Sequence, residues 1–316
     1  MPKKQGIELE GYDEKPVSPD RYDEEWLLSI GGYQSFVESR GNNLRPRLRK
    51  SLELADISAG TSILDIGCGR GETVLWAAMR GGRRSVGIDY SRDSLHTAKK
   101  TVALASGEIG QRIGLYLADA KALPFATASF DRILMNDIVE HLHNWELNDC
   151  LQEIRRVLRD DGYVVIHTLP NRWTLDWSYK LIRLFVRRLP PEPRDRYAKT
   201  MHINEQSLIS LEKLLRSNGF ACKIWLENIF IEHARWSIKE ERGIAKKGAA
   251  GKAYTLLQNP MWSKAYCMLS QTPMKLLLVS DIYGIAWKSN GSTPHVLAKL
   301  PAARLERFCT FLARLI

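Results

Sequence analysis

The sequence, 316 residues long, predicts an α/β protein built on a doubly wound sheet of seven strands, the last of them antiparallel. Three observations carry this prediction. Short apolar runs alternate with helical stretches from Thr61 onward, a glycine-rich turn at Gly67 follows the first run, and Asp89 ends the second. Such alternation is typical of strands joined by crossover helices, with ligands bound where the strands end. We therefore expect a Rossmann-like core over residues 59–171.

The chain before this core is predicted to form an arm and a lid. Residues 1–20 are polar, contain two prolines and show no periodicity, so we interpret them as a flexible arm. Residues 21–58 carry apolar positions at helical spacing, and breaks near Gly41 and Pro46 indicate two helices. We expect these helices to lie over the entrance to the core as a lid.

Five apolar runs of the core are predicted as strands, and three stretches between them as helices. The strands are expected at 62–66, 85–89, 114–119, 132–136 and 163–168, and the helices at 71–80, 93–105 and 146–158. A further helix over 207–217 ends before Gly219, and apolar runs over 220–231 and 282–287 supply the last two strands.

The second half of the chain adds two segments that combine apolar stripes with basic residues. In 172–200, helical spacing puts four apolar side chains on one side and two arginines near another: Trp177, Leu181, Leu184 and Phe185, with Arg183 and Arg187. The C-terminal helix expected over 291–316 has a similar stripe: Leu297, Leu305, Phe308, Leu312 and Ile316. Such stripes either pack on their own domain or dock on an anionic membrane. The remainder, 201–290, completes the sheet around a helical insertion at 233–275.

Composition indicates a folded protein without a transmembrane helix. Apolar residues make up 44% and charged residues 26%, as in an ordinary globular domain. The start lacks the apolar run of a secretory signal, and the five cysteines show no CxxC pair, so we expect a cytoplasmic protein. The net charge of +10 lies largely outside the core, because from Arg242 to Ile316 eleven Lys and Arg face two Asp and Glu.

The strongest local signal is the turn Gly67-x-Gly69-x-Gly71. Glycines permit a tight turn and a close backbone approach to a ligand, while the next helix directs free N–H groups at it. Glu72 stands where the dinucleotide fingerprint has its third glycine, and its negative charge would oppose a pyrophosphate. A zwitterionic amino-acid moiety, with its amine facing Asp65, suits this loop better.

Two acidic strand ends complete the predicted cofactor site. Asp89 follows Gly67 by 22 residues, a distance at which a carboxylate accepts both hydroxyls of an unphosphorylated ribose. The alternative role for Asp89 is to cap the helix after Ser91, and the nearby glycine loop favours the ribose. Asp119 and Ala120 end the third strand, where they would meet an adenine amino group.

These motifs resemble, in order and spacing over residues 60–170, the small-molecule class I methyltransferases, in particular the group that contains the ubiquinone-biosynthesis O-methyltransferases. The motifs are Leu64-Asp-Ile-Gly-Cys-Gly-Arg-Gly, Gly87-Ile-Asp89, Ala118-Asp-Ala, Leu123-Pro-Phe, Ser129-Phe-Asp131, Glu140-His141-Leu and Arg156-Val-Leu-Arg-Asp-Asp-Gly. The resemblance implies that the cofactor is S-adenosylmethionine. The residues expected to line it are Asp65, Gly67, Cys68, Gly69, Asp89, Tyr90, Asp119, Ala120 and Asn136.

A cluster after the fourth strand is a candidate metal site. In the ubiquinone group, Glu-x-x-Glu-His at this point is associated with a divalent metal, and this chain has Asp137, Glu140 and His141 there. On a helical turn these positions share one face and could hold an oxygen-loving ion such as Mg²⁺. The alternative, which we favour, is that Glu140 and His141 only order the turn by hydrogen bonds.

Methyl transfer to oxygen is helped by a base that removes the acceptor's proton. His141 is the first candidate for this base, and His202 is the second. For either histidine a structural role remains the alternative. His167 lies on a predicted strand and is expected to be buried and hydrogen-bonded.

The resulting hypothesis is methyl transfer to a hydroxyl of a small or lipid-linked acceptor, with peripheral contact to the inner face of an anionic membrane as a possible addition. Two alternatives stay open. The basic charge would suit an RNA methyltransferase, although no recognisable RNA-binding module is present. A non-catalytic partner protein that binds S-adenosylmethionine would share the cofactor site. Oligomeric state and the methylated atom do not follow from the sequence.

Overall fold

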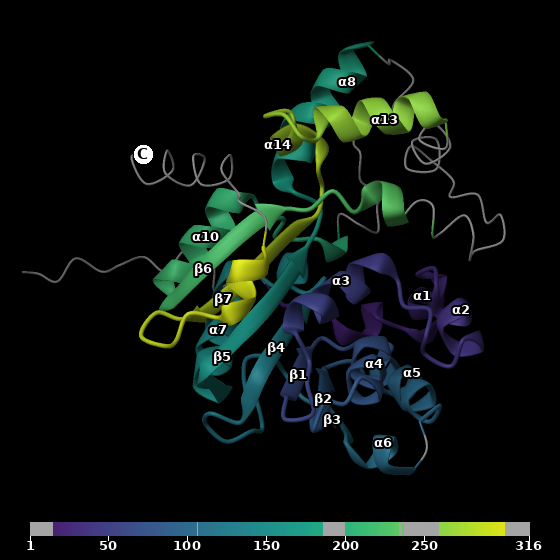
Figure 1. The fold of residues 1–316 in the computed structure, drawn as a ribbon, viewed down its shortest axis with the longest axis vertical. Helices are drawn as coiled ribbons and strands as arrows, with labels where there is room; N and C mark the ends of the chain where they lie inside the picture. The colour runs from purple at the N-terminus through teal and green to yellow at the C-terminus, as the bar shows by residue number, and fades with distance from the viewer. Residues whose placement is uncertain (1–14, 106, 186–199, 234–235, 237–258, 301–316) are drawn as a thin grey trace, which may run out of the picture.

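The computed structural model describes residues 15–105, 107–185, 200–233, 236 and 259–300. Its centre is a seven-stranded sheet in the order β3-β2-β1-β4-β5-β7-β6 (Figure 1). Strands β1 to β5 pair in parallel, and β7 pairs antiparallel with both β5 and β6. The strands are β1 (Ser62–Ile66), β2 (Arg84–Asp89), β3 (Ile113–Leu117), β4 (Phe130–Asn136), β5 (Leu158–Thr168), β6 (Phe220–Leu226) and β7 (Ile282–Lys288). The predicted Rossmann-like sheet with an antiparallel last strand is confirmed.

Helices cover both faces of the sheet. Successive strand residues point to opposite faces, so Ile63 and Leu64 belong to different apolar clusters. Helices α7 and α10 pack on the face of Leu64, whereas α3 and α4 pack on the face of Ile63. The helices are α1 (Glu24–Ser29), α2 (Tyr33–Glu38), α3 (Pro46–Ala55), α4 (Glu72–Met79), α5 (Arg92–Val102), α6 (Gly107–Gln111), α7 (Asn144–Val157), α8 (Lys180–Phe185), α10 (Leu208–Ser217), α13 (Pro260–Leu269) and α14 (Lys275–Leu278).

The N-terminal region differs from its prediction. It forms three helices rather than two, because Gly32, at φ +93°, separates α1 from α2 before the predicted break at Gly41. The third helix, α3, buries Leu48 and Leu52 in the apolar cluster against the sheet, so it is part of the core. A lid over the entrance would have to come from residues before α3.

The end of the sixth strand was also predicted wrongly. β6 stops at Leu226, because Glu227 and Asn228 interrupt the apolar run that was predicted to continue to Ile231. Asn228 instead donates a hydrogen bond to the hydroxyl of Ser270, just past α13. The polar residues therefore end the strand and tie it to the insertion before β7.

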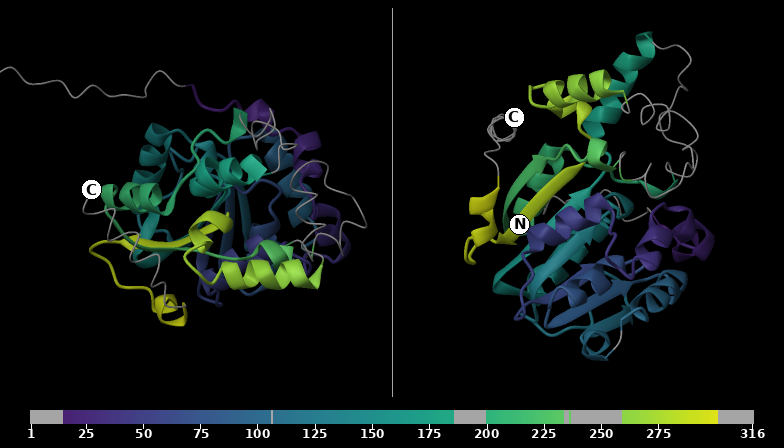
Figure 2. Two further views of the ribbon diagram at one scale, coloured as in Figure 1. Left: turned by 90° about the horizontal axis from the view of Figure 1, so that it is seen from above. Right: turned by 45° about the vertical axis from the view of Figure 1, so that its right-hand side comes forward.

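The insertions project beyond the sheet. The helical segment η3 (Thr174–Tyr179) continues into α8 after β5, and α13 and α14 lie between β6 and β7. Figures 1 and 2 show α8 and α13 together at one end of the molecule, away from α4, α5 and α6. The predicted stripes extend into 186–199 and 301–316, and the insertion into 237–258, all outside the described residues. In the part of the chain that is described, no helix is both long and apolar enough to cross a membrane.

Candidate cofactor and active site

The glycine turn at the end of β1 has the conformation that its sequence predicts. Gly67, Gly69 and Gly71 all have positive φ, at +70°, +50° and +74°, a region that other residues rarely adopt. A Cβ on Gly67 would lie 2.9 Å from the side chain of Ile138, so the turn also needs a small residue there. Gly71 then starts α4, with the free N–H groups of the first helical turn beside the turn's backbone.

Asp89 is held at the end of β2 by two backbone donors. One carboxylate oxygen accepts from the N–H of Gly69 at 2.9 Å and the other from the N–H of Ser91 at 2.9 Å. Ser91 itself caps α5, so the alternative of Asp89 as the helix cap is not what the structure shows. Each oxygen retains a further acceptor site for a ligand hydroxyl.

Asp89 lines a cavity at the carboxyl ends of the parallel strands, where open α/β sheets bind their ligands. Seven of the residues predicted for cofactor, metal or catalysis line it: Gly67, Asp89, Tyr90, Asp119, Ala120, Asp137 and His141. Six others do not line it: Asp65, Cys68, Gly69, Asn136, Glu140 and His202. The sequence reasoning did not single out several more that do, which are Val17, Tyr22, Lys121, Ile138, Leu142 and Glu146.

The predicted residues outside the cavity have different surroundings. The side chain of Cys68 packs against Gly87 of β2, where a Cβ would meet its sulfur at 2.8 Å, so only its backbone belongs to the turn. Asp65 and Asn136 are buried and carry side-chain atoms without a hydrogen-bond partner among the described residues. Burial raises the pKa of Asp65 to about 7. These unpaired atoms fit an amino-acid moiety that brings its own donors and acceptors.

The charge of Glu72 does not face the ligand, contrary to the prediction from sequence. Its carboxylate is buried against the guanidinium of Arg70, with an N–O separation of 2.8 Å, so its charge is compensated and does not oppose a ligand phosphate. Arg70 also donates to the carbonyls of Leu27 and Ile30, which fixes α1 to the glycine turn. The expectation of a zwitterionic ligand therefore rests on the unpaired atoms of Asp65 and Asn136.

Residues 15–20, the described end of the arm predicted over 1–20, are held against the cavity rather than loose. The carbonyl of Val17 accepts from the hydroxyl of Tyr90 at 3.0 Å, and the carbonyl of Lys15 lies 3.0 Å from a ring nitrogen of His143. The hydroxyl of Tyr22 lies 3.1 Å from Nδ1 of His141. The stretch 15–22 is thus held over the pocket by contacts with residues far along the chain, which local periodicity does not reveal.

The position of Tyr22 in the cavity lining predicts that its side chain contributes to cofactor binding. Replacing Tyr22 with Ala should weaken S-adenosylmethionine binding about tenfold, because the ring packs edge-on against Tyr90 in the cavity wall. Tyr22→Phe keeps the ring and should change the Kd less than about threefold. Isothermal titration calorimetry measures both constants. Equal losses in the two variants would show that the hydroxyl contact to His141 matters more than the ring.

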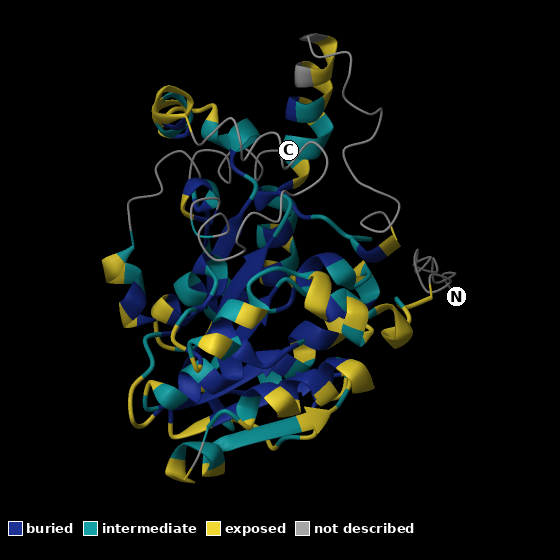
Figure 3. Ribbon diagram, turned by 90° about the vertical axis from the view of Figure 1, so that its right-hand side faces the viewer, coloured by how far each residue is buried: buried dark blue, intermediate teal, exposed yellow. Residues whose placement is uncertain are grey.

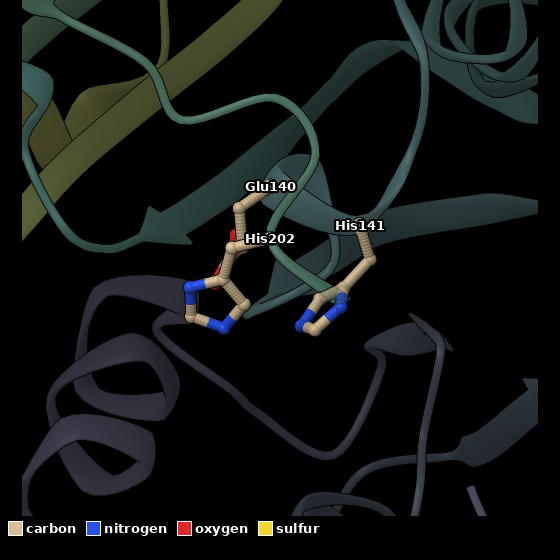
Figure 4. A group of neighbouring side chains, drawn as sticks. All are labelled: Glu140, His141 and His202. Carbon is tan, nitrogen blue, oxygen red and sulfur yellow. The ribbon is translucent and has the colours of Figure 1, made fainter. Parts of the chain in front are cut away.

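Glu140, His141 and His202 meet beside the cavity, and Figure 4 shows their side chains gathered near one another. Their ligand atoms lie within 4.8 Å of one another. The loop that carries His202 is tied to this turn, because Asn204 donates from its backbone to the carbonyl of Glu140 at 3.1 Å. Glu140 also accepts from the hydroxyl of Thr168 at the end of β5. The two predicted catalytic histidines are therefore neighbours.

The grouping differs from the predicted metal site, because Asp137 is outside it. One carboxylate and two imidazoles are donors that suit zinc or another transition ion, whereas magnesium requires oxygen ligands. The residues therefore do not fit the Mg²⁺ that we considered from sequence. The hydrogen bonds from Thr168 and to Tyr22 agree with the ordering role that we favoured for Glu140 and His141.

Asp137, whose side chain is exposed by 32%, instead pairs with a buried histidine. Its carboxylate lies 2.5 Å from Nδ1 of His167, whose Nε2 lies 3.1 Å from Asp281, and Asp281 pairs with Arg47 of α3 at 2.8 Å. Burial disfavours a charged His167, yet the two carboxylates raise its pKa to about 9. Asp137 has φ +53°, an unusual value for this residue type that the network holds in place. His167 is buried and hydrogen-bonded, as predicted.

The protonation state of His141 departs from the expectation of a base near neutrality. Burial, with the neighbouring His202, lowers the pKa of His141 to about 3. The ring is consequently neutral at ordinary pH and can accept a hydrogen bond, but it retains a proton poorly.

Comparison with known proteins agrees with this geometry. Residues 63–162 match the protein family described as a methyltransferase domain. Methyltransferase GfsG of Streptomyces halstedii is 38% identical over 124 residues, which cover 39% of this chain and 43% of that protein. Ubiquinone biosynthesis O-methyltransferase of Bartonella bacilliformis is 29% identical over 163 residues, 51% of this chain and 60% of that protein. The matches thus span less than two thirds of either relative.

A solved structure extends the likeness of fold beyond the matched domain. The structure of phosphoethanolamine N-methyltransferase 2 from Haemonchus contortus aligns with a TM-score of 0.58, covering 89% of this chain and 61% of that chain. At 20% identity this similarity concerns the fold alone.

The sheet order, the glycine turn and the carboxylate at the end of β2 together define the class I methyltransferases that use S-adenosylmethionine. Within that class, residues 63–162 of this chain match the methyltransferase domain family.

Proposed function

We propose that the whole chain transfers the methyl group of S-adenosylmethionine to a hydroxyl of a small or lipid-linked acceptor. One observation carries this proposal: Gly67, Asp89, Asp137 and His141 line the same cavity, so the cofactor residues and the candidate base face one space. The name of the Bartonella relative, an O-methyltransferase, supports oxygen as the methylated atom.

The proposed reaction is an in-line displacement. The acceptor oxygen attacks the methyl carbon, the carbon–sulfur bond breaks, and its electron pair stays on sulfur to give S-adenosylhomocysteine. The hydroxyl proton must leave during this step. His141, neutral and at the cavity wall, accepts a hydrogen bond from the hydroxyl and aligns it, and His202 beside it receives the proton. Burial of the cavity under residues 15–22 excludes water from the methyl group.

The proposal is tested by following S-adenosylhomocysteine formation with the purified chain. Phenols and alcohols in buffer, the same acceptors attached to acyl chains in detergent micelles, and total RNA serve as three separate arms. Product in either hydroxyl arm supports the proposal, and product with RNA alone contradicts it. Calorimetry provides the cofactor control: heat with a nicotinamide dinucleotide and none with S-adenosylmethionine would overturn methyl transfer altogether.

Replacing His141 with Ala should lower turnover about 100-fold with the best acceptor of this panel, because the group that aligns the acceptor hydroxyl is lost. The Kd for S-adenosylmethionine should stay within about threefold of that of the original protein. His96, exposed on α5, offers a matched control, and His96→Ala should leave both quantities unchanged. Unaltered turnover in His141→Ala would remove this residue from the mechanism.

A further inference from the structure

Large apolar side chains are exposed on the helices that project beyond the sheet. Of the twelve such side chains exposed in the described part of the chain, eight lie within 177–184 or 261–274. On the first segment, Trp177, Leu181 and Leu184 are exposed by 67%, 51% and 73% and follow the i, i+4, i+7 spacing of one helical face. They line one shallow hollow together, so they share a face in the structure as well.

Helix α13 turns apolar side chains toward solvent, which is the reverse of the usual arrangement. Its exposed positions include Met261, Trp262 and Met268, whereas the small polar residue Ser263, and Ser270 just past its end, are buried. A helix on the surface of a water-soluble domain normally turns its apolar stripe inward. The same reversal occurs in η3, where Ser178 is buried next to the exposed Trp177. These exposed apolar faces therefore indicate a site that contacts another protein or a membrane.

Helix α14 joins the two segments, because it contacts the first and the hydroxyl of Tyr266 in α13 donates to its Leu278 carbonyl at 3.3 Å. The hydroxyl of Ser178 donates to the carbonyl of Leu277 in α14, and the side-chain amide of Asn171 donates to the carbonyls of Leu276 and Val279 at 3.0 and 3.2 Å. Figures 1 and 2 show α8 and α13 at the same end of the molecule, and Figure 3 marks exposed positions on both. We call Trp177, Leu181, Leu184, Met261, Trp262 and Met268 the apolar helix surface.

This surface is connected to the candidate active site. The segment η3 follows β5 closely, and the last residue of β5, Thr168, donates a hydrogen bond to Glu140 beside His141. The helices thus begin beyond the carboxyl ends of the strands, which is the end of the sheet at which the acceptor must enter. The apolar helix surface therefore extends from the same end of the sheet as the cavity.

The charges around the surface favour an anionic partner. Within 172–185 and 259–278 there are five Lys and Arg and one acidic residue, Asp176. Asp176 is paired with Arg172 at 3.1 Å. Lys180 and Arg183 on α8 and Lys264 on α13 lie among the exposed apolar side chains. Two copies of this face would repel each other through these cations, whereas anionic lipid headgroups would attract them.

We propose that the apolar helix surface docks on an anionic phospholipid bilayer and thereby brings the active-site entrance to a lipid-linked acceptor. The inference rests on the proposed methyl transfer and selects the lipid-linked class among its acceptors. Tryptophan, leucine and methionine enter the headgroup and acyl boundary, while the lysines and arginines contact the lipid phosphates. The described helices lie on the bilayer and do not cross it.

Sedimentation with sucrose-loaded vesicles tests the proposal on the full chain. Vesicles of phosphatidylcholine with phosphatidylglycerol should carry the protein down, and vesicles of phosphatidylcholine alone should carry down much less. The double variant Leu181→Gln/Leu184→Gln should partition at least about tenfold more weakly, since two apolar side chains leave the interface. Leu28→Gln is the matched control, because Leu28 on α1 is exposed by 48%, nearly as far as Leu181, and should bind like the original protein.

Three outcomes would overturn the proposal. The first is no sedimentation with anionic vesicles, and the second is equal sedimentation of the double variant and the original protein. The third is a dimer without vesicle binding that the double variant dissociates, which would make a second copy the occupant. Titrating the same samples with S-adenosylmethionine separates the two claims: retained cofactor binding without vesicle binding defeats the docking alone, and lost cofactor binding defeats the proposed function.

Discussion

Replacing Asp89 with Ala is expected to weaken S-adenosylmethionine binding by about 100-fold, corresponding to about 3 kcal/mol. The carboxylate lines the cavity, and its orientation is set by the N–H groups of Gly69 and Ser91. Two ribose hydroxyls that donate to a charged acceptor would lose their partner in a site that excludes most water. Hydrogen bonds to charged groups contribute more than neutral ones, so the effect on affinity should be large.

The comparison with Asp89→Asn separates charge from shape. Asparagine keeps one acceptor oxygen for the Gly69 N–H, so the turn should persist while the affinity falls about tenfold. Asp93→Ala, at an exposed position of α5, should leave the Kd unchanged. Calorimetry gives the constants, and far-UV circular dichroism verifies the fold. A folded Asp89→Ala protein with undiminished affinity would refute the assignment of Asp89 to the ribose.

The second large effect concerns stability. Replacing His167 with Leu should lower the free energy of unfolding by about 3 kcal/mol, because Asp137 loses its cation and the buried Asp281 keeps only Arg47 as a charged partner. The control is a surface pair of the same type: His295 and Asp56 approach to 2.6 Å but are largely exposed, so His295→Ala should cost less than about 1 kcal/mol. Urea unfolding at pH 6 measures both differences.

The pH dependence has a definite sign. Because the pKa of His167 is about 9 in the folded protein and near 6.5 when unfolded, its stabilisation is complete below pH 6.5 and is lost as pH rises through 9. The difference in unfolding free energy between the original protein and His167→Leu should therefore shrink over this interval. A difference that stays constant from pH 6 to pH 9.5 would contradict a charged His167 in the folded state.

Much of the core was predictable because its signals are local. β1 occupies 62–66 as expected, since a short apolar run before a glycine turn has few other conformations. Gly67 and Asp89 reach the cavity because they stand at the carboxyl ends of neighbouring parallel strands, β1 and β2. Positions at strand ends follow from the order of elements, so motif spacing was sufficient to identify them.

Other assignments failed because they depend on contacts between distant parts of the chain. Glu72 looked like a charge facing the ligand, but Arg70 pairs with it in the folded protein. Tyr22 fell in the segment 21–58 that was predicted as a lid, with no role at the site, and its hydroxyl lies against His141, 119 residues away. A sequence pattern does not show which side chains share a buried space, and that sharing decides charge and protonation.

The sequence by itself determined the α/β class, the positions of the strands in the cofactor half and the residues of the glycine turn, because periodicity and turn chemistry act over a few residues. Only the tertiary structure decided that Asp137 pairs with His167 rather than with Glu140 and His141, and that α13 turns Met261, Trp262 and Met268 outward. Both depend on which segments pack together, and packing selects one helical face or one ion partner from several that local sequence allows equally.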